Sequence, residues 1–105
     1  MTETVIKVQI HPLQPRWIDI EKPKYRLYID DDLITERTWI WDMQTFIEEE
    51  LLVEISRGIM HTVRLDLIKS NPMHLAQFGL QNLNINGEYE KDSGGHRSEL
   101  SFILA

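Results

Sequence analysis

The sequence contains no cysteine among its 105 residues. Disulfide frameworks, thiolate zinc sites and cysteine nucleophiles are therefore excluded. A chain of this length can still bury a core as one domain without a disulfide or a structural metal. We expect a single domain over residues 1–105, and nothing in the sequence implies a cofactor.

Positive charge is also scarce, since 11 Lys and Arg residues stand against 17 Asp and Glu residues, for a net charge of −6. Nucleic-acid binding comes mostly from Lys and Arg that neutralise phosphates, so we expect no nucleic-acid partner. No segment approaches the ~18 apolar residues of a membrane span, so no membrane partner is expected. The first residues, MTETVIKVQI, lack the basic start and apolar block of a signal peptide, which predicts synthesis in the cytoplasm.

Short segments that alternate apolar and polar residues run through the chain. Ile6, Val8 and Ile10 alternate with Lys7 and Gln9, which is the period of a half-buried strand. Further segments of this kind cover residues 24–29, 33–41, 46–55, 61–68, 78–85, 88–90 and 100–105. Pro, Gly, Asn and Asp separate them. With no long helical run, this pattern predicts an all-β, single-domain antiparallel β-sandwich of about seven or eight short strands.

Residues 43–54 are the ambiguous part of this assignment, which the sequence leaves open between helix and strand. Their alternation favours a strand, whereas helical spacing of the apolar residues and Thr45 as an N-cap favour a helix. We prefer the strand, because residues 56–58, Ser-Arg-Gly, have the composition of a turn and residues 61–68 return as a strand. The two strands would then form a hairpin-like pair.

Two local features follow from the strand interpretation. Glu49 would point inward, and because a buried lone carboxylate is costly, either Arg37 or Arg64 should pair with it. In residues 78–85 the apolar side chains change face, which predicts a bulge or kink near Gly79 to Asn82.

Three stretches, YRLYIDDDLITERTW, LLVEISRGIMHTVRLDLI and LAQFGLQNLNING, resemble the jelly-roll carbohydrate-binding modules and their galactose-binding-like relatives. Those families run through a strand, an Asp-rich bend, further strands and a final Asn-Gly turn in a similar order. The resemblance implies a jelly-roll-like sandwich and transfers no ligand. By fold-level analogy, the same sandwich serves as a head-decoration or adaptor subunit in phage particles, which this short acidic chain also resembles.

Asp30, Asp31 and Asp32 raise the question of a carboxylate site. Carboxylates suit calcium, which takes ~6 to 8 oxygen ligands, but successive residues of an extended chain point to alternate sides. Asp also favours turns, because its side chain bonds nearby backbone and tolerates left-handed conformations. We interpret the run first as a hairpin bend with Asp31 and Asp32 at its tip, then as a weak metal candidate, and last as catalytic.

The sequence offers no catalytic constellation, so we do not expect an enzyme. The run Glu48 to Glu50 has the composition of a solvated face instead of a glycosidase pair. The four histidines are scattered, without the spacing that puts two metal ligands on one face. The serines lack the G-x-S-x-G elbow of a nucleophile.

The aromatic residues are the strongest functional lead. Trp39 and Trp41 would share one face of a strand, about 7 Å apart, and Tyr28 could approach from the paired strand. They would fill the core, form a protein interface, or stack against a sugar. The terminal strand, LSFILA, is apolar to its end and includes Phe102; it would pair within the sheet or with a neighbouring chain.

These observations predict a non-enzymatic structural or interaction subunit of a larger protein assembly, for which a phage virion decoration or adaptor protein is the specific example. Trp39, Trp41, Tyr28 and Phe102 would contact other subunits, either copies of this chain or a capsid protein. The expected location is the virion after synthesis in the cytoplasm, or otherwise the cytoplasm. The alternative is a carbohydrate-binding module with a tryptophan platform for a glycan.

Overall fold

The structure of the chain is a computed structural model, and it describes residues 1–13, 24–40, 45–68, 78–90 and 97–105. The strands in these residues are β1 (Thr2–Pro12), β2 (Lys24–Ile29), β3 (Asp32–Thr38), β4 (Ile47–Ile55), β5 (Met60–Ile68), β6 (Phe78–Ile85), β7 (Glu88–Tyr89) and β8 (Glu99–Ile103). The described ranges contain no helix. For these residues the all-β prediction is confirmed.

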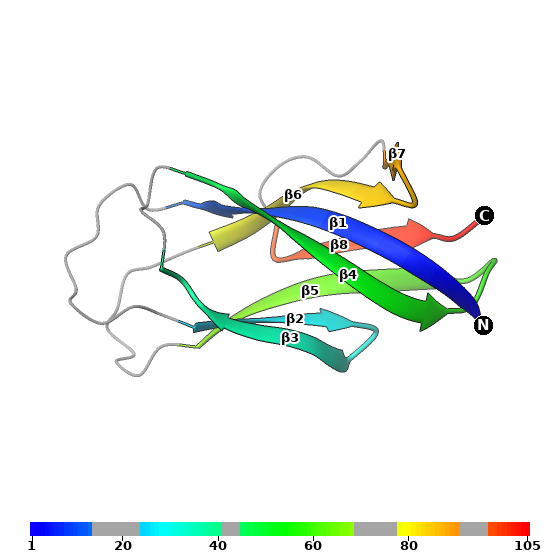
Figure 1. The fold of residues 1–105 in the computed structure, drawn as a ribbon, viewed down its shortest axis with the longest axis horizontal. Helices are drawn as coiled ribbons and strands as arrows, with labels where there is room; N and C mark the ends of the chain where they lie inside the picture. Colours follow the sequence, from blue (N-terminus) through cyan, green and yellow to red (C-terminus); the bar gives the residue numbers. More distant parts are fainter. Residues whose placement is uncertain (14–23, 41–44, 69–77, 91–96) are drawn as a thin grey trace.

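The strands form two antiparallel sheets that pack against each other (Figure 1). One sheet has the order β4-β1-β6-β7 and the other the order β3-β2-β5-β8. The predicted antiparallel β-sandwich is therefore confirmed, with eight strands in the described part. The order differs from that of a jelly roll, because the first and last strands lie in different sheets instead of side by side.

The core lies between the sheets and receives every second side chain of the long strands. Ile6, Val8 and Ile10 of β1 are fully buried, as are Tyr25 and Leu27 of β2. The other buried apolar residues are Ile29, Trp39, Leu51, Ile55, Val63, Leu65, Phe78, Leu80, Leu83, Ile85, Leu100, Phe102 and Leu104. Alternation alone therefore identified the inward face of β1.

Residues 47–55 are a strand, as preferred, but the predicted hairpin between β4 and β5 is wrong. β4 pairs with β1 from Thr2↔Ile55 to Ile10↔Ile47, whereas β5 pairs with β2 and β8 in the opposite sheet. Residues 56–59, which we call the arch, therefore carry the chain from one sheet to the other. Both strands have an apolar face, and each strand contributes that face to the core from its own sheet.

Gly58 gives the arch its sharp turn, because its φ is +80°, a conformation that residues with a Cβ rarely adopt. A Cβ added there would meet no atom within 4 Å, so the cost of a substitution is confined to the backbone. We expect Gly58→Ala to lower the free energy of unfolding by about 1 to 2 kcal/mol, measured by urea denaturation. Gly58→Asn is the control, since Asn tolerates positive φ, and equal stability of all three proteins would contradict the prediction.

The predicted bulge between Gly79 and Asn82 is confirmed. Asn82 has a φ of 57°, and the β1–β6 register shifts between Lys7 and Gln9. The Asn82 side chain then donates a hydrogen bond to the Gln9 side-chain oxygen, at 2.7 Å. Because of this bulge, Phe78 and Leu80 before it and Leu83 and Ile85 after it all face the core, although the alternation of apolar residues changes phase between the two pairs.

Candidate functional site

Trp39 belongs to the core, where it is 1% exposed. β3 ends at Thr38, earlier than predicted, so Trp39 leaves the strand and packs between Tyr25 and Phe78, with ring centroids 6.3 and 4.6 Å away. The core alternative is correct for Trp39, and its assignment to an interface or a sugar platform is wrong. Trp41 lies outside the described residues.

Tyr28 and Phe102 do not join Trp39 on a common surface. Tyr28 is half-buried on the outer face of its sheet, where the Arg64 guanidinium lies 4.3 Å from its ring centroid. Phe102 is buried, with its ring centroid 5.5 Å from that of His61, so its predicted interface role is wrong. Because Tyr28 and Trp39 point to opposite faces, the predicted stacking platform does not form from these two residues.

The aspartates form the hairpin bend that was expected, displaced by one residue. Asp30 and Asp31 have φ values of 50° and 72°, the two left-handed residues of a tight β2–β3 turn, while Asp32 begins β3. The register between β2 and β3 shifts after Leu27, which accommodates one extra residue, Ile34. Because Ile29 pairs with Asp32, the tip consists of Asp30 and Asp31 instead of the predicted Asp31 and Asp32.

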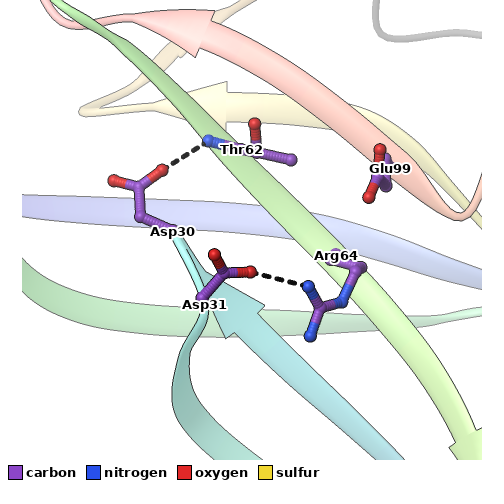
Figure 2. A pocket seen from close by; sticks show the side chains of 5 residues that line it. All are labelled: Asp30, Asp31, Thr62, Arg64 and Glu99. Atoms are coloured by element: carbon purple, nitrogen blue, oxygen red, sulfur yellow. Dashed lines mark hydrogen bonds and ion pairs between the residues drawn. The ribbon is translucent and has the colours of Figure 1, made fainter.

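The two turn aspartates face donors on β5, not a shared cation (Figure 2). Asp30 accepts the Thr62 backbone N–H at 2.8 Å and also binds the His61 ring, while Asp31 accepts Arg64 Nη1 at 2.8 Å. Among the described residues, no group of three or more potential metal-binding side chains comes together. The geometry thus gives the metal candidacy of Asp30, Asp31 and Asp32 no support.

A polar hollow of about 280 Å³ lies beside this turn on the outer face of the sheet. Its lining residues are Asp30, Asp31, Thr62, Arg64 and Glu99 (Figure 2). Arg64 has further partners besides Asp31, because its Nε lies 3.3 Å from an Asp66 carboxylate oxygen and its guanidinium lies over the ring of Tyr28. The residues that line the hollow therefore hold the β2–β3 turn against β5 through hydrogen bonds and ion pairs.

His61 lies beneath this turn and is the residue whose importance sequence inspection missed. It is 3% exposed, and its two ring nitrogens face the Asp30 carboxylate and, at 2.6 Å, the Ser56 carbonyl oxygen. Burial lowers the pKa of the imidazole, but the hydrogen bonds to Asp30 and Ser56 outweigh burial and raise that pKa above its ordinary value. Because the Ser56 carbonyl occupies the second nitrogen, the Asp30–His61 pair has no nitrogen left to act as a catalytic base.

No family model, curated protein or solved structure matches this chain. The assignment of function therefore depends on the chain's own residues. Among the described residues, no helix is long and apolar enough to cross a membrane.

Glu49 is buried between the edge strands of the two sheets, as the strand interpretation required. Arg37 Nε lies 2.8 Å from its carboxylate, which settles the expected choice between Arg37 and Arg64, and the Tyr25 hydroxyl donates to the same oxygen at 2.5 Å. Burial, together with the hydrogen bond to Glu49, raises the pKa of Tyr25 far above its ordinary value, so the phenol remains a donor. This cluster joins β4 to β2 and β3.

The chain termini and the arch lie at the same end of the sandwich (Figure 1). Large apolar side chains of these segments are exposed. They are Met1, Ile59, Met60 and Ile103, which are 92%, 55%, 66% and 54% exposed, and we call them the apolar end. Met60 and Ile103 are cross-strand partners, and Met1 and Ile59 line one groove of about 300 Å³. The same groove is bordered by Asp30 and His61, so the apolar end lies directly beside the buried histidine.

Proposed function

We propose that this chain is a non-enzymatic structural subunit of a larger protein assembly and binds a partner protein through the apolar end. The observation that carries the proposal is the grouping of Met1, Ile59, Met60 and Ile103 at one end of the sandwich. Exposed apolar side chains gathered at one end of a small protein are typical of interaction surfaces. A phage virion decoration or adaptor subunit is the specific form of this proposal.

The charges around the apolar end indicate which kind of partner fits. Asp32 and Glu54 border its groove, and Glu54 lies directly opposite Glu3 in the β1–β4 pair. Like charges facing each other across a strand pair are unfavourable until a cation compensates them. The complementary surface is therefore apolar with a rim of Lys and Arg, and it belongs to a different protein, since a second copy would bring acidic groups against acidic groups.

Met60→Glu tests this proposal, because a charge placed in an apolar interface must lose its hydration. The probe is the particle, or the capsid protein, of the phage that the proposal expects to encode this chain, with binding measured by co-sedimentation or interferometry. We expect the affinity of the chain to fall about tenfold or more, the effect typical of a central interface residue.

Leu52→Glu is the matched control, because Leu52 is 63% exposed, lies on β4 in the other sheet, and receives the same charge. It should bind like the unmodified chain. Equal loss in both variants, or binding unaffected by Met60→Glu, would contradict the proposal. Light scattering on the free chain adds a second check: a homo-oligomer that Met60→Glu dissociates would make the partner a second copy and contradict the charge argument.

A further inference from the structure

His61 makes two hydrogen bonds that a neutral histidine cannot make together. Both partners, the Asp30 carboxylate and the Ser56 carbonyl, are acceptors, so both ring nitrogens must carry a proton. A neutral imidazole has only one N–H group. The geometry therefore requires the imidazolium form at a position that is 3% exposed.

The charges around the ring favour this form. The titratable and charged groups that surround it are Asp30, Asp32, Glu54, Arg57 and the amino terminus at Met1. Arg57 is directed away, toward the Thr2 hydroxyl at 3.2 Å and the Ala105 carbonyl at 2.8 Å. β8 contributes only the uncharged ring of Phe102, so the near surroundings of the imidazole are predominantly negative.

We propose that His61 acts as a proton-operated latch, whose imidazolium form holds the arch against the β2–β3 turn and whose neutral form releases the arch. The His61–Asp30 and His61–Ser56 hydrogen bonds differ in whether other contacts hold the partner in place. Asp30 is also tied to Thr62, by the carboxylate at 2.8 Å and by its own N–H at 3.0 Å. On deprotonation the remaining N–H stays with the carboxylate, because that bond is charge-assisted. The bare nitrogen then faces the Ser56 carbonyl oxygen, and the two lone pairs repel.

The release is local, because other bonds continue to hold the arch. The Gly58 N–H donates to the Leu104 carbonyl at 2.9 Å, and Arg57 still binds the end of the chain. The arch therefore loosens without unfolding of the sandwich. Since Ile59 belongs to the apolar end, pH also controls the shape of the proposed binding surface, and this consequence alone depends on the proposed function.

The direction of the pH dependence follows from linkage. Because the folded-state pKa of His61 is raised above its unfolded value of about 6.5, the latch contributes fully below that pH. Its contribution is lost as the pH rises through the folded-state pKa. The arch should therefore be protected in mildly acidic solution and loosen toward alkaline pH.

Nuclear magnetic resonance on the free chain tests the latch without any partner. We expect the His61 ring to titrate with a midpoint above 6.5. The Gly58 amide, whose bond to Leu104 opens more often once the arch has loosened, should lose about tenfold or more of its protection against hydrogen exchange through the same titration. Exchange rates are corrected for their intrinsic pH dependence. A midpoint at or below 6.5, or arch protection that does not change through it, would overturn the inference.

Two neighbouring substitutions in the same turn separate the latch from general effects of charge. Asp30→Asn removes the charged acceptor of His61, whereas Asp31→Asn removes a carboxylate that binds Arg64 instead. Both keep a side chain that tolerates positive φ. Asp30→Asn should lower the His61 midpoint and the pH of arch loosening, and Asp31→Asn should change neither; equal shifts would overturn the inference. If partner affinity stays constant while the latch titrates, the surface consequence fails and the latch stands.

Discussion

Replacing Trp39 by alanine is expected to lower the free energy of unfolding by about 3 to 5 kcal/mol, the largest effect of any single substitution considered for this chain. Trp39 is among the largest fully buried side chains and packs against both Tyr25 and Phe78. Its removal loses the transfer free energy of the indole and leaves a cavity. Because a domain of this size has a total stability of only about 5 to 15 kcal/mol, the substitution removes a large fraction of it.

Guanidinium denaturation followed by far-ultraviolet circular dichroism measures this effect without relying on tryptophan fluorescence. Leu52→Ala is the control, because Leu52 is an exposed apolar residue on an edge strand and its truncation should change stability by about 0.5 kcal/mol or less. A Trp39→Ala protein as stable as the control would show that Trp39 is not part of the core. That outcome would reopen its interface and glycan assignments.

Replacing Arg37 by methionine is expected to cost about 2 to 3 kcal/mol. The substitution leaves Glu49, whose side chain is 7% exposed, with its charge and only the Tyr25 hydroxyl as a partner. Breaking a fully buried ion pair costs about 3 to 5 kcal/mol, and the lower figure applies because the Arg37 side chain is 55% exposed. Urea denaturation at neutral pH gives the value directly.

A second substitution, Glu49→Gln, tests whether the unpaired charge of Glu49 causes the loss of stability in Arg37→Met. In the Arg37→Met background it removes the unpaired charge while leaving an oxygen for Tyr25, so part of the stability should return. Arg26→Met is the surface control: the Arg26–Glu36 pair is exposed on both sides, and its loss should leave stability almost unchanged. If the double variant is no more stable than Arg37→Met alone, the buried charge is not what Arg37 compensates.

Local patterns in the sequence predicted the pieces of this fold well. The alternation of Ile6, Val8 and Ile10 identified both a strand and its buried face, and the change of phase in β6 identified the bulge at Asn82. The inward position of Glu49 even predicted a pairing arginine, which is Arg37. These predictions succeed because a strand's period and the cost of an unpaired buried charge are local properties.

The candidate site could not be predicted in the same way. Asp30 and His61 are 31 residues apart, and neither belongs to a motif that identifies a histidine–carboxylate pair. Only the pairing of β2 with β5 brings the turn over the start of β5, and only the arch brings Ser56 to the other ring nitrogen. The prediction that Trp39 lies on a binding surface was wrong for a related reason. β3 ends at Thr38, and this end determines the direction of the Trp39 side chain.

Local sequence patterns were sufficient to predict an acidic, cysteine-free β-sandwich, the inward residues of β1, and a bend at the aspartates. Long-range pairing determined which strands are neighbours, placed β4 and β5 in opposite sheets, and put His61 between the bend and the arch. The physical reason is that backbone hydrogen bonds between strands are alike for every residue. The choice of neighbour therefore depends on how all the apolar faces are buried together, which no local pattern contains.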